Sequence, residues 1–502
     1  MVVTNLREIV KYSAHNYGDQ AAYRYKVGKE VEEKTFNDVN RDTMAISRAV
    51  EALGMKGKHI ALIGATTYQW ISSYFGIVNS GSVAVPIDAQ LPAAAICELL
   101  NRADVEMLIF DVIRADVAAA VKEACSKIKY IVSMQAESEQ DGILSWKELV
   151  ENNRGEYETG IDADQLCTIL FTSGTTGLSK GVMLSHRNLA DNATCLDMKI
   201  PVGNVSMTVL PINHVYCLTM DIVKGMYIGS TVCINDSIMH MQKNLKLFQP
   251  DMVLMVPLMI ESFYAKLKAA GDAYPKAVIG QMAFGGKLKT ICSGGAYLDP
   301  DYVDRFAEYG ITILQGYGMT ECSPVISNNL EWDNRKGSVG KLLPNCECKI
   351  VDNEIWVKGS SVMQGYYKMP RETAETLEDG WLKTGDLGYI DEDNFVYITG
   401  RKKNLIILAN GENVSPEEIE NQIAKDDLVK EIIVREKEKV IQAEIFPDYE
   451  YAEAVGITDI PAKLQELVDA YNSDAPVYKR VLDLIVRKTE FEKNTSKKIK
   501  RY

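Results

Sequence analysis

The sequence predicts an α/β protein with a large N-terminal domain of doubly wound sheets, a β-rich subdomain and a small α+β C-terminal domain. At 502 residues the chain is longer than one hydrophobic core usually spans. Strand-like and helix-like segments alternate through its N-terminal part, which is typical of parallel sheets covered on both faces. After about residue 337 the pattern changes to alternating strands joined by polar turns.

The N-terminal elements follow one another in a regular order. A helix is expected over 35–54, where apolar residues recur at helical spacing and a glycine ends the run. A buried strand over 58–64, a helix over 68–81 and a short strand over 82–87 then form the pattern of a parallel β–α–β unit. Further strand patterns occupy 103–111, 128–134, 230–236 and 311–318.

The β-rich stretch ends near residue 400, where a new α+β pattern begins. Residues 346–367 and 386–400 alternate as strands do, with the polar turn DEDN inside the second range. A helix should start at Ser415 as N-cap, with Pro416 in the first helical position and Glu418 placed for a capping box. We therefore expect an N-terminal domain over 1–400, with its β-rich subdomain from about 337, and a C-terminal domain over 401–502.

Composition and charge argue against several classes of protein. The chain is 46% hydrophobic and 25% charged, as globular proteins are, and its net charge of −14 disfavours nucleic-acid binding. No apolar run reaches the ~18 residues of a membrane span, and the N-terminal segment meets charge by Arg7, so we expect neither a span nor a signal peptide. Ten scattered cysteines without CxxC and five histidines argue against zinc and favour reduced thiols in the cytoplasm.

One loop carries the strongest chemical signal. The stretch LFTSGTTGLSKGVMLSH, residues 170–186, places small hydroxyl residues and glycines between a strand-like run and Lys180. Glycines let consecutive backbone N–H groups face an anion, and hydroxyl groups donate to phosphate oxygens without adding charge. The spacing is not that of a P-loop, because Ser179 stands where GxxxxGK[ST] requires glycine and Gly181 follows the lysine. The loop predicts a phosphate site of another kind; a surface loop without a role is the alternative.

Five more motifs follow this loop in order along the chain. They are SGGAYL at 293–298, QGYGMTE at 315–321, GWLKTGDLGYID at 380–391, TGRKKNLIILANGENVSPEEIE at 399–420 and NTSKKIKR at 494–501. Together with the loop they resemble the adenylate-forming superfamily of acyl- and aryl-CoA synthetases, peptide-synthetase adenylation domains and luciferases. The resemblance spans essentially the whole chain, is greatest to bacterial fatty acyl-CoA synthetases, and implies that the C-terminal domain is mobile.

The resemblance implies a site for ATP and Mg²⁺. The loop would hold the β- and γ-phosphates with Lys180 nearby, through Thr172, Ser173, Gly174, Thr175, Thr176 and Gly177. Glu321 would contact Mg²⁺, because a hard oxygen ligand suits that ion, and Thr320 would touch the α-phosphate. Asp386 would accept the ribose hydroxyls, with Arg401 helping from the other side. The adenine would lie among Gly294, Gly295, Ala296, Tyr317, Gly318 and Met319, with Tyr317 stacked on it.

The resemblance also assigns catalytic and hinge residues. Lys498 would bridge the carboxylate and the α-phosphate while negative charge gathers there. Relatives have glycine before this lysine, whereas this chain has Lys497, so the register is open by one residue; Lys498 is preferred because Ile499 follows it. Lys403 would be the pivot of a hinge, and Gly411 would keep the path of the CoA thiol open.

The segment LPINHVYCLTMDIVKGMY, residues 210–227, is similar to the acyl-binding segment of the family, with His214 near the carboxylate. Amino-acid-activating relatives place an aspartate close to the start of this segment. Here no acidic residue occurs before Asp221, so an uncharged acyl group is expected.

The sequence therefore predicts a cytoplasmic, AMP-forming acid–thiol ligase that uses ATP, Mg²⁺ and CoA. Its substrate would be a carboxylic acid, favoured to be a medium- or long-chain fatty acid. One alternative is a stand-alone adenylating enzyme that stops at acyl-AMP or loads a separate acyl-carrier protein. An inactive ligand-binding relative and a luciferase-type oxygenase are two more, and the joint presence of Glu321, Asp386, Arg401 and Lys498 argues against the inactive relative.

Overall fold

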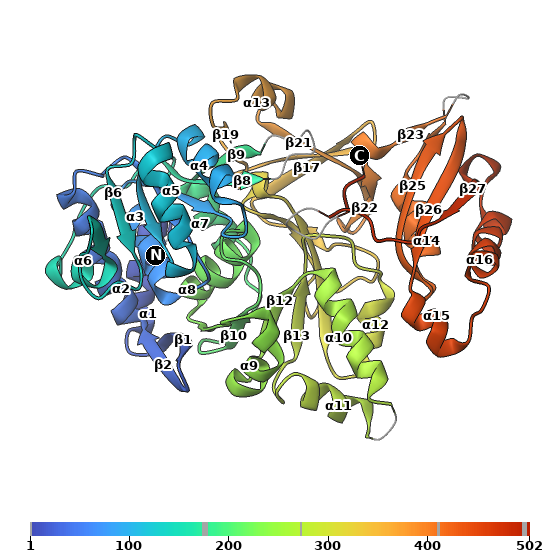
Figure 1. The fold of residues 1–502 in the computed structure, drawn as a ribbon, viewed down its shortest axis with the longest axis horizontal. Coiled ribbons are helices and arrows are strands. Elements are labelled where there is room, and N and C mark those ends of the chain that lie inside the picture. The colour runs from blue at the N-terminus through green and yellow to red at the C-terminus, as the bar shows by residue number, and fades with distance from the viewer. Residues whose placement is uncertain (1–2, 173–178, 272–273, 409–411, 494–498, 502) are drawn as a thin grey trace. The chain divides into compact units, whose positions relative to one another are not determined.

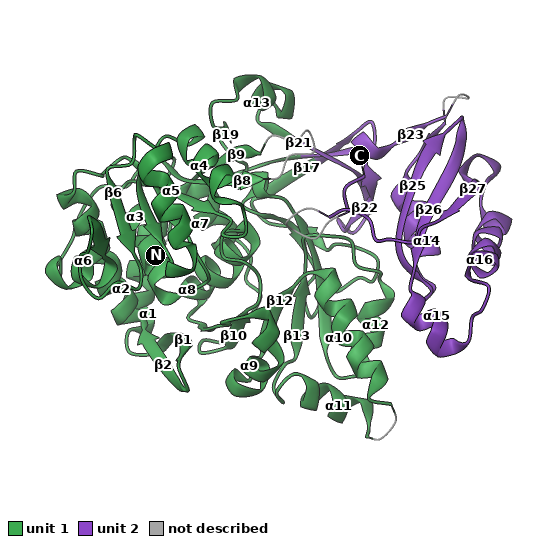
Figure 2. Ribbon diagram, viewed as in Figure 1, with its two compact units in different colours: residues 1–348, 357–382 green, residues 349–356, 383–502 purple. Residues whose placement is uncertain are grey.

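The chain forms two compact units. The computed structural model describes residues 3–172, 179–271, 274–408, 412–493 and 499–501 (Figure 1). The first unit comprises residues 1–348 and 357–382, and the second comprises 349–356 and 383–502 (Figure 2). The chain passes between the units within strands β17 (Cys346–Val351), β18 (Glu354–Gly359) and β21 (Trp381–Ile390). These units are defined by compactness alone, so the predicted domain boundary at 400/401 stays a prediction.

The first unit contains an eight-stranded sheet in the order β19-β9-β8-β4-β3-β5-β6-β7. Its strands β3 to β8 run parallel where they pair, whereas β9 and β19 run antiparallel to their neighbours. The bounds are β3 (His59–Ile63), β4 (Val83–Ile87), β5 (Val105–Phe110), β6 (Tyr130–Ser133), β7 (Ile143–Ser145), β8 (Leu166–Thr172), β9 (Lys180–Ser185) and β19 (Gly365–Tyr366).

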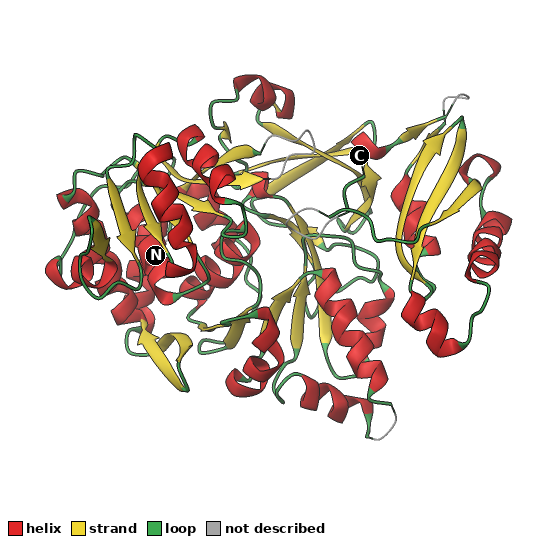
Figure 3. Ribbon diagram, viewed as in Figure 1, coloured by secondary structure: helices red, strands yellow, loops and turns green. Residues whose placement is uncertain are grey.

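Helices cover both faces of this sheet. Helices α4 (Ala93–Arg102) and α5 (Ala115–Ala124) pack on alternate strand residues such as Ile63, Val85 and Leu108. Residues that alternate with these face the other side, where α3 (Tyr68–Asn79) packs against β3 and β4, and α2 (Phe36–Ala52) packs against α3. The resulting alternation of helices and strands is visible in Figure 3 and confirms the predicted doubly wound fold class.

The first unit also contains a nine-stranded sheet in the order β16-β15-β14-β13-β12-β10-β11-β1-β2. The six central strands from β14 to β1 run parallel. The bounds are β1 (Ala21–Val27), β2 (Glu30–Thr35), β10 (Val205–Thr208), β11 (Thr231–Ile234), β12 (Met252–Met255), β13 (Thr290–Ser293), β14 (Thr312–Gly318), β15 (Val325–Asn328) and β16 (Lys341–Leu342).

The first unit contains further helices. A π-helix over Cys217–Val223 and helix α8 (Lys224–Ile228) join β10 to β11. The others are α1 (Leu6–Tyr17), α6 (Trp146–Asn152), α7 (His186–Thr194), α9 (Met241–Phe248), α10 (Pro257–Ala269), α11 (Lys276–Ala283), α12 (Asp301–Ala307) and α13 (Pro370–Thr376). No helix of the described residues combines the length and the apolar character that crossing a bilayer requires.

The second unit is an α+β structure with its own core. Strands β25 (Val429–Lys437), β26 (Val440–Pro447) and β27 (Val481–Val486) form a sheet. Helices α14 (Pro416–Ile423), α15 (Tyr449–Val455) and α16 (Ile460–Asp474) contribute apolar residues to the core beside it. A five-stranded sheet has the order β17-β18-β21-β20, with β20 spanning Leu377–Glu378, and β22 (Val396–Arg401) also pairs with β21. Strand β23 (Ile406–Ile407) pairs with β24 (Asn413–Val414).

The local start signals of helices were predicted more accurately than their side-chain contacts. Helix α2 begins after Thr35, whose hydroxyl forms a capping box with Asp38. Helix α14 starts at Pro416 after Ser415, as predicted, but the predicted capping box with Glu418 is wrong. The Ser415 hydroxyl instead donates to the Thr399 carbonyl oxygen at 2.9 Å, and Glu418 accepts from Lys479 at 2.6 Å.

Candidate active site

The ends of the predicted phosphate loop are held by a pair of strands. β8 and β9 are antiparallel neighbours, and Thr172 at the end of β8 lies opposite Lys180 at the start of β9. The Thr172 hydroxyl reaches the carbonyl oxygen of Lys180 at 3.5 Å. The predicted phosphate contacts Ser173, Gly174, Thr175, Thr176 and Gly177 lie outside the described residues, so their roles stay predictions.

A tyrosine connects the predicted metal ligand with the predicted phosphate lysine. Glu321 is 9% exposed, and its Oε1 accepts a hydrogen bond of 2.8 Å from the Tyr366 hydroxyl. The Lys180 ammonium lies 4.6 Å from the centroid of the Tyr366 ring, within the range of a cation–π contact. Tyr366 reaches both groups because β19 pairs with β9, with Tyr366 opposite Val182.

The electrostatics of this group favour a neutral phenol at Tyr366. Burial raises the pKa of Tyr366 well above its ordinary value, and the neighbouring Glu321 carboxylate raises it further. The phenol therefore keeps its proton and donates it in the hydrogen bond. Sequence analysis missed Tyr366, because no local pattern shows that it lies between Glu321 and Lys180.

The predicted adenine and α-phosphate residues gather at one edge of the nine-stranded sheet. β13 and β14 are adjacent and parallel, so the chain leaves both at the same edge. Gly294, Gly295 and Ala296 follow β13, while Tyr317 and Gly318 end β14, with Met319 and Thr320 next in the chain. Gly318 is required sterically, because a Cβ there would lie 2.0 Å from the Pro324 carbonyl oxygen. A Cβ at Gly294 would lie 3.1 Å from the Tyr216 ring, which is a tight contact.

The predicted acyl segment starts beside this edge. His214 is exposed, and its carbonyl oxygen accepts from the Leu218 amide at 3.0 Å, just before the π-helix. Tyr216 donates from its hydroxyl to the Cys292 carbonyl oxygen on β13 at 3.2 Å. The segment over 210–227 therefore packs on the strand that leads into Gly294.

The predicted ribose contacts form an ion pair within the second unit. Asp386 on β21 lies opposite Arg401 on β22, and Arg401 Nε is 2.8 Å from Asp386 Oδ1. Asp386 is 2% exposed, whereas Arg401 is exposed. Two residues along, partial burial and the neighbouring Arg401 charge lower the pKa of the predicted hinge residue Lys403. The arrangement presents a fixed carboxylate with an exposed guanidinium beside it.

The residues that flank the predicted catalytic lysine are held on the second unit. Ile499 pairs with Lys493 and packs against Ile433, Phe446 and Phe491. The Arg501 guanidinium donates to Glu420 Oε1 at 2.8 Å. Lys498, its alternative Lys497 and Gly411 lie outside the described residues, so their roles and the register of the tail stay predictions.

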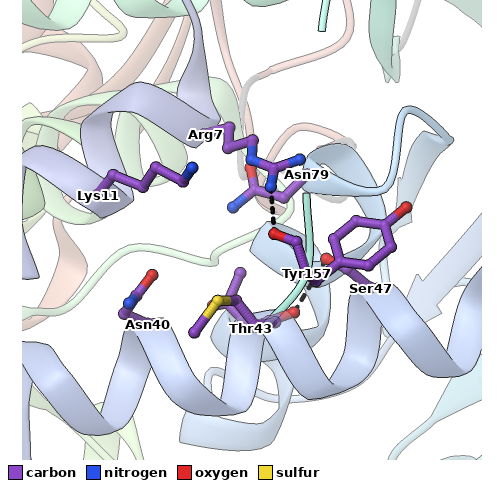
Figure 4. A pocket seen from close by; sticks show the side chains of 8 residues that line it. Arg7, Lys11, Asn40, Thr43, Ser47, Asn79 and Tyr157 are labelled. Carbon is purple, nitrogen blue, oxygen red and sulfur yellow. Dashed lines mark hydrogen bonds between the residues drawn. The ribbon is translucent and has the colours of Figure 1, made fainter. Parts of the chain in front are cut away.

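A small pocket between α1 and α2 is separate from all of these residues. Figure 4 shows its lining by Arg7, Lys11, Asn40, Thr43, Met44, Ser47, Asn79 and Tyr157. Its volume of about 10 Å³ holds about one water-sized group, so it is no nucleotide site.

Comparisons with known proteins show the family of the chain. Residues 10–367 match the family model of the AMP-binding enzymes, and residues 403–501 match that of the AMP-binding enzyme C-terminal domain. The 4-coumarate–CoA ligase-like 9 of Oryza sativa subsp. japonica is 30% identical over 461 residues, which cover 85% of this chain and 80% of that protein. A long-chain-fatty-acid–CoA ligase of Bacillus subtilis (strain 168) is 28% identical over 474 residues, covering 86% and 82%.

A solved structure shows the same fold. The anthranilate CoA ligase AuaEII, in complex with anthranoyl-AMP, superposes with a TM-score of 0.85 at 21% identity, covering 99% of this chain and 96% of that one. The predicted fold class and superfamily are thereby confirmed, and so, at the level of the family, is the prediction of an enzyme of the acyl-CoA synthetase type. The chain belongs to the AMP-binding enzyme family.

Proposed function

We propose that the chain is an AMP-forming acid–CoA ligase that activates a medium- or long-chain fatty acid in the cytoplasm. The observation that carries the proposal is the group of Glu321, Tyr366 and Lys180 beside the end of β8. It combines a buried carboxylate, a hydrogen-bond donor that orients it, and a cation next to the predicted phosphate loop. These three components suit the binding of a nucleoside triphosphate together with a divalent cation.

The first half-reaction makes the carboxylate reactive. A thiol cannot displace oxide from a carboxylate at a useful rate, so one carboxylate oxygen attacks the α-phosphorus of ATP and the bond to pyrophosphate breaks. In this proposal Lys180 and Thr172 bind the departing phosphates and Thr320 binds the α-phosphate. Lys498 stabilises the negative charge that develops between the carboxylate and the α-phosphate.

The residues around Glu321 fit a magnesium ion. A carboxylate is a hard oxygen ligand, and Mg²⁺ binds proteins through one or two carboxylates while phosphates and waters fill its other positions. Tyr366 holds Oε1 of this carboxylate and so fixes its orientation, as a neighbour of a metal ligand commonly does. Bound Mg²⁺ supplies positive charge that neutralises the phosphate oxygens.

The second half-reaction transfers the acyl group. The CoA thiol, having lost its proton, attacks the acyl carbon; a C–S bond forms, the C–O bond to AMP breaks, and AMP leaves. We propose that Lys403 is the pivot for the change between the two half-reactions, and that Gly411 keeps the thiol's path open. Asp386 and Arg401 would hold the ribose throughout, with the buried carboxylate accepting two hydroxyl groups.

The composition of the predicted acyl segment supports an acyl chain as the substrate. The segment after His214 contains buried apolar residues, among them Val215, Leu218 and Ile222.

The test is ATP–pyrophosphate exchange with a panel of acids, followed by thioester formation with CoA. Exchange that depends on a fatty acid, and thioester that depends on CoA, are the expected results. Exchange without thioester, or thioester only on an added acyl-carrier protein, would favour the stand-alone adenylating enzyme. No exchange with any acid would overturn the proposal.

A further inference from the structure

A buried carboxyl group lies in the predicted acyl-binding segment with one oxygen unpaired. Asp221 is 3% exposed, and its Oδ2 is buried without a hydrogen-bond partner. It lies on the π-helix Cys217–Val223, and π-helical turns are rare and frequently found at functional sites. Because an unpaired buried polar group costs stability, its presence in this segment needs an explanation.

Asp221 follows Tyr216 by five positions, the spacing of a π-helical hydrogen bond, so both residues lie on the same side of the π-helix. Tyr216 donates from its hydroxyl to the Cys292 carbonyl oxygen on β13 at 3.2 Å, and its ring lies 3.1 Å from where a Cβ of Gly294 would be. Burial raises the pKa of Tyr216, and the Cys292 thiol and the Asp221 carboxyl raise it further. Asp221 therefore lies on the side of the π-helix from which Tyr216 reaches the predicted nucleotide contact Gly294.

No cation compensates this carboxyl among the described residues. Lys224, three positions further on, directs its ammonium to the carbonyl oxygens of Ala193 at 3.0 Å and Leu196 at 2.9 Å. Burial raises the pKa of Asp221 well above its ordinary value, and this effect exceeds that of the hydrogen bond with the Cys217 thiol, which lowers the pKa. Burial without a nearby cation therefore favours the protonated carboxyl, which can both donate and accept a hydrogen bond.

We propose that Asp221 determines specificity by hydrogen-bonding a hydroxyl group on the acyl chain, so that the substrate is a hydroxy-substituted fatty acid; this rests on the proposed function. A hydroxyl group donates and accepts, as a protonated carboxyl does. An ammonium group would need an ionised Asp221, and burying that ion pair takes two charges out of water. A plain alkyl chain would leave the Asp221 Oδ2 unpaired.

The experiment compares acids of one length that differ only in a hydroxyl group. Pyrophosphate release is measured with dodecanoic acid and with each of its monohydroxy isomers. The wild-type enzyme should prefer one hydroxy isomer, with kcat/KM about 10-fold or more above that for dodecanoic acid. Asp221→Leu should lower kcat/KM for that isomer by about 10- to 100-fold and leave dodecanoic acid unchanged or improved. Asp221→Asn should keep part of the preference, because an amide still donates and accepts.

Thr219→Val is the matched control. The Thr219 hydroxyl is also buried without a partner, on the same π-helix, but two positions away and therefore on a different side. This variant should leave the selectivity unchanged. The melting temperature gives a readout besides activity: Asp221→Leu should raise it, because the unpaired buried carboxyl is removed, whereas a structural role for Asp221 predicts a lower one.

Several results would overturn the inference. One is a wild-type enzyme with the same kcat/KM for dodecanoic acid and all its monohydroxy isomers. Another is a preference for amino-substituted acids that Asp221→Asn abolishes. A third is an Asp221→Leu variant whose kcat/KM falls equally for all acids. If Asp221→Leu does not fold, the same comparison is made with Asp221→Asn. Turnover of dodecanoic acid without any hydroxy preference would refute this inference and leave the proposed function intact; no turnover of any acid would refute both.

Discussion

Replacing Tyr366 by phenylalanine should raise the magnesium requirement of adenylation with little effect on ATP binding at saturating Mg²⁺. The substitution removes the hydroxyl that donates to Glu321 at 2.8 Å and keeps the ring that lies 4.6 Å from the Lys180 ammonium. A hydrogen bond to a charged group contributes about 1.5–3 kcal/mol, and part of that remains because water can replace the donor. If half of it orients the carboxylate, the Mg²⁺ concentration for half-maximal activity rises by about 3- to 10-fold.

The assay is acid-dependent ATP–pyrophosphate exchange measured over a range of Mg²⁺ concentrations. A second variant, Tyr366→Leu, tests the contribution of the ring. Because its loss also removes a cation–π contact of about 0.5–2 kcal/mol with Lys180, this variant should raise the KM for ATP as well. Tyr68→Phe is the matched control: its hydroxyl donates to the buried Asp42 carboxylate at 2.7 Å, on helices remote from the predicted site. That variant should lose stability without changing the Mg²⁺ requirement.

The reasoning is refuted if Tyr366→Phe and Tyr68→Phe behave alike. Equal losses of melting temperature with an unchanged Mg²⁺ requirement in both variants would mean that the Tyr366 hydroxyl only stabilises the fold.

Three further predictions concern other parts of the site and the fold. Glu321→Gln should weaken Mg²⁺-dependent adenylation far more than AMP binding by calorimetry; equal losses would make Glu321 structural. Lys498→Ala should slow acyl-AMP formation by about 10²- to 10³-fold yet still convert preformed acyl-AMP and CoA to thioester, whereas selective loss of adenylation in Lys497→Ala would shift the register by one residue. Burial lowers the pKa of His186 to about 3. The unfolded chain therefore binds a proton at this residue below about pH 6.5, whereas the folded protein binds it only near pH 3. The free energy of unfolding should fall as the pH falls between these two values. His186→Gln should flatten this acid limb in melting curves; an unchanged slope would assign it to other groups.

Local patterns in the sequence predicted the elements well because their causes are local. Ser415 precedes helix α14 as expected, since N-cap preferences depend on a few neighbouring residues. The capping box at Glu418 failed because Lys479, far along the chain, binds that carboxylate and the Thr399 carbonyl takes the Ser415 hydroxyl. Tertiary contacts of this kind leave no trace within a short window.

In the site, too, local motifs were predicted but tertiary contacts were not. The resemblance named Glu321 and Lys180 as separate members of two motifs, but only the pairing of β19 with β9 reveals that Tyr366 contacts both. The π-helix at Cys217–Val223 was likewise not predicted, because its sequence has no feature that distinguishes it from an α-helix. The role proposed for Asp221 was not predicted either. In the sequence, Asp221 was interpreted only as an acidic residue too far from the start of the segment to bind an amine.

Transfer of oxygen from the acid to AMP tests the central claim most directly. The enzyme is given a fatty acid labelled with ¹⁸O in its carboxylate, together with ATP, Mg²⁺ and CoA, and the products are analysed by mass spectrometry. If a carboxylate oxygen attacks the α-phosphorus and the thiol then attacks the acyl carbon, each AMP carries one ¹⁸O and the pyrophosphate carries none. Label in orthophosphate, or AMP without label while thioester accumulates, would contradict an acyl-AMP route.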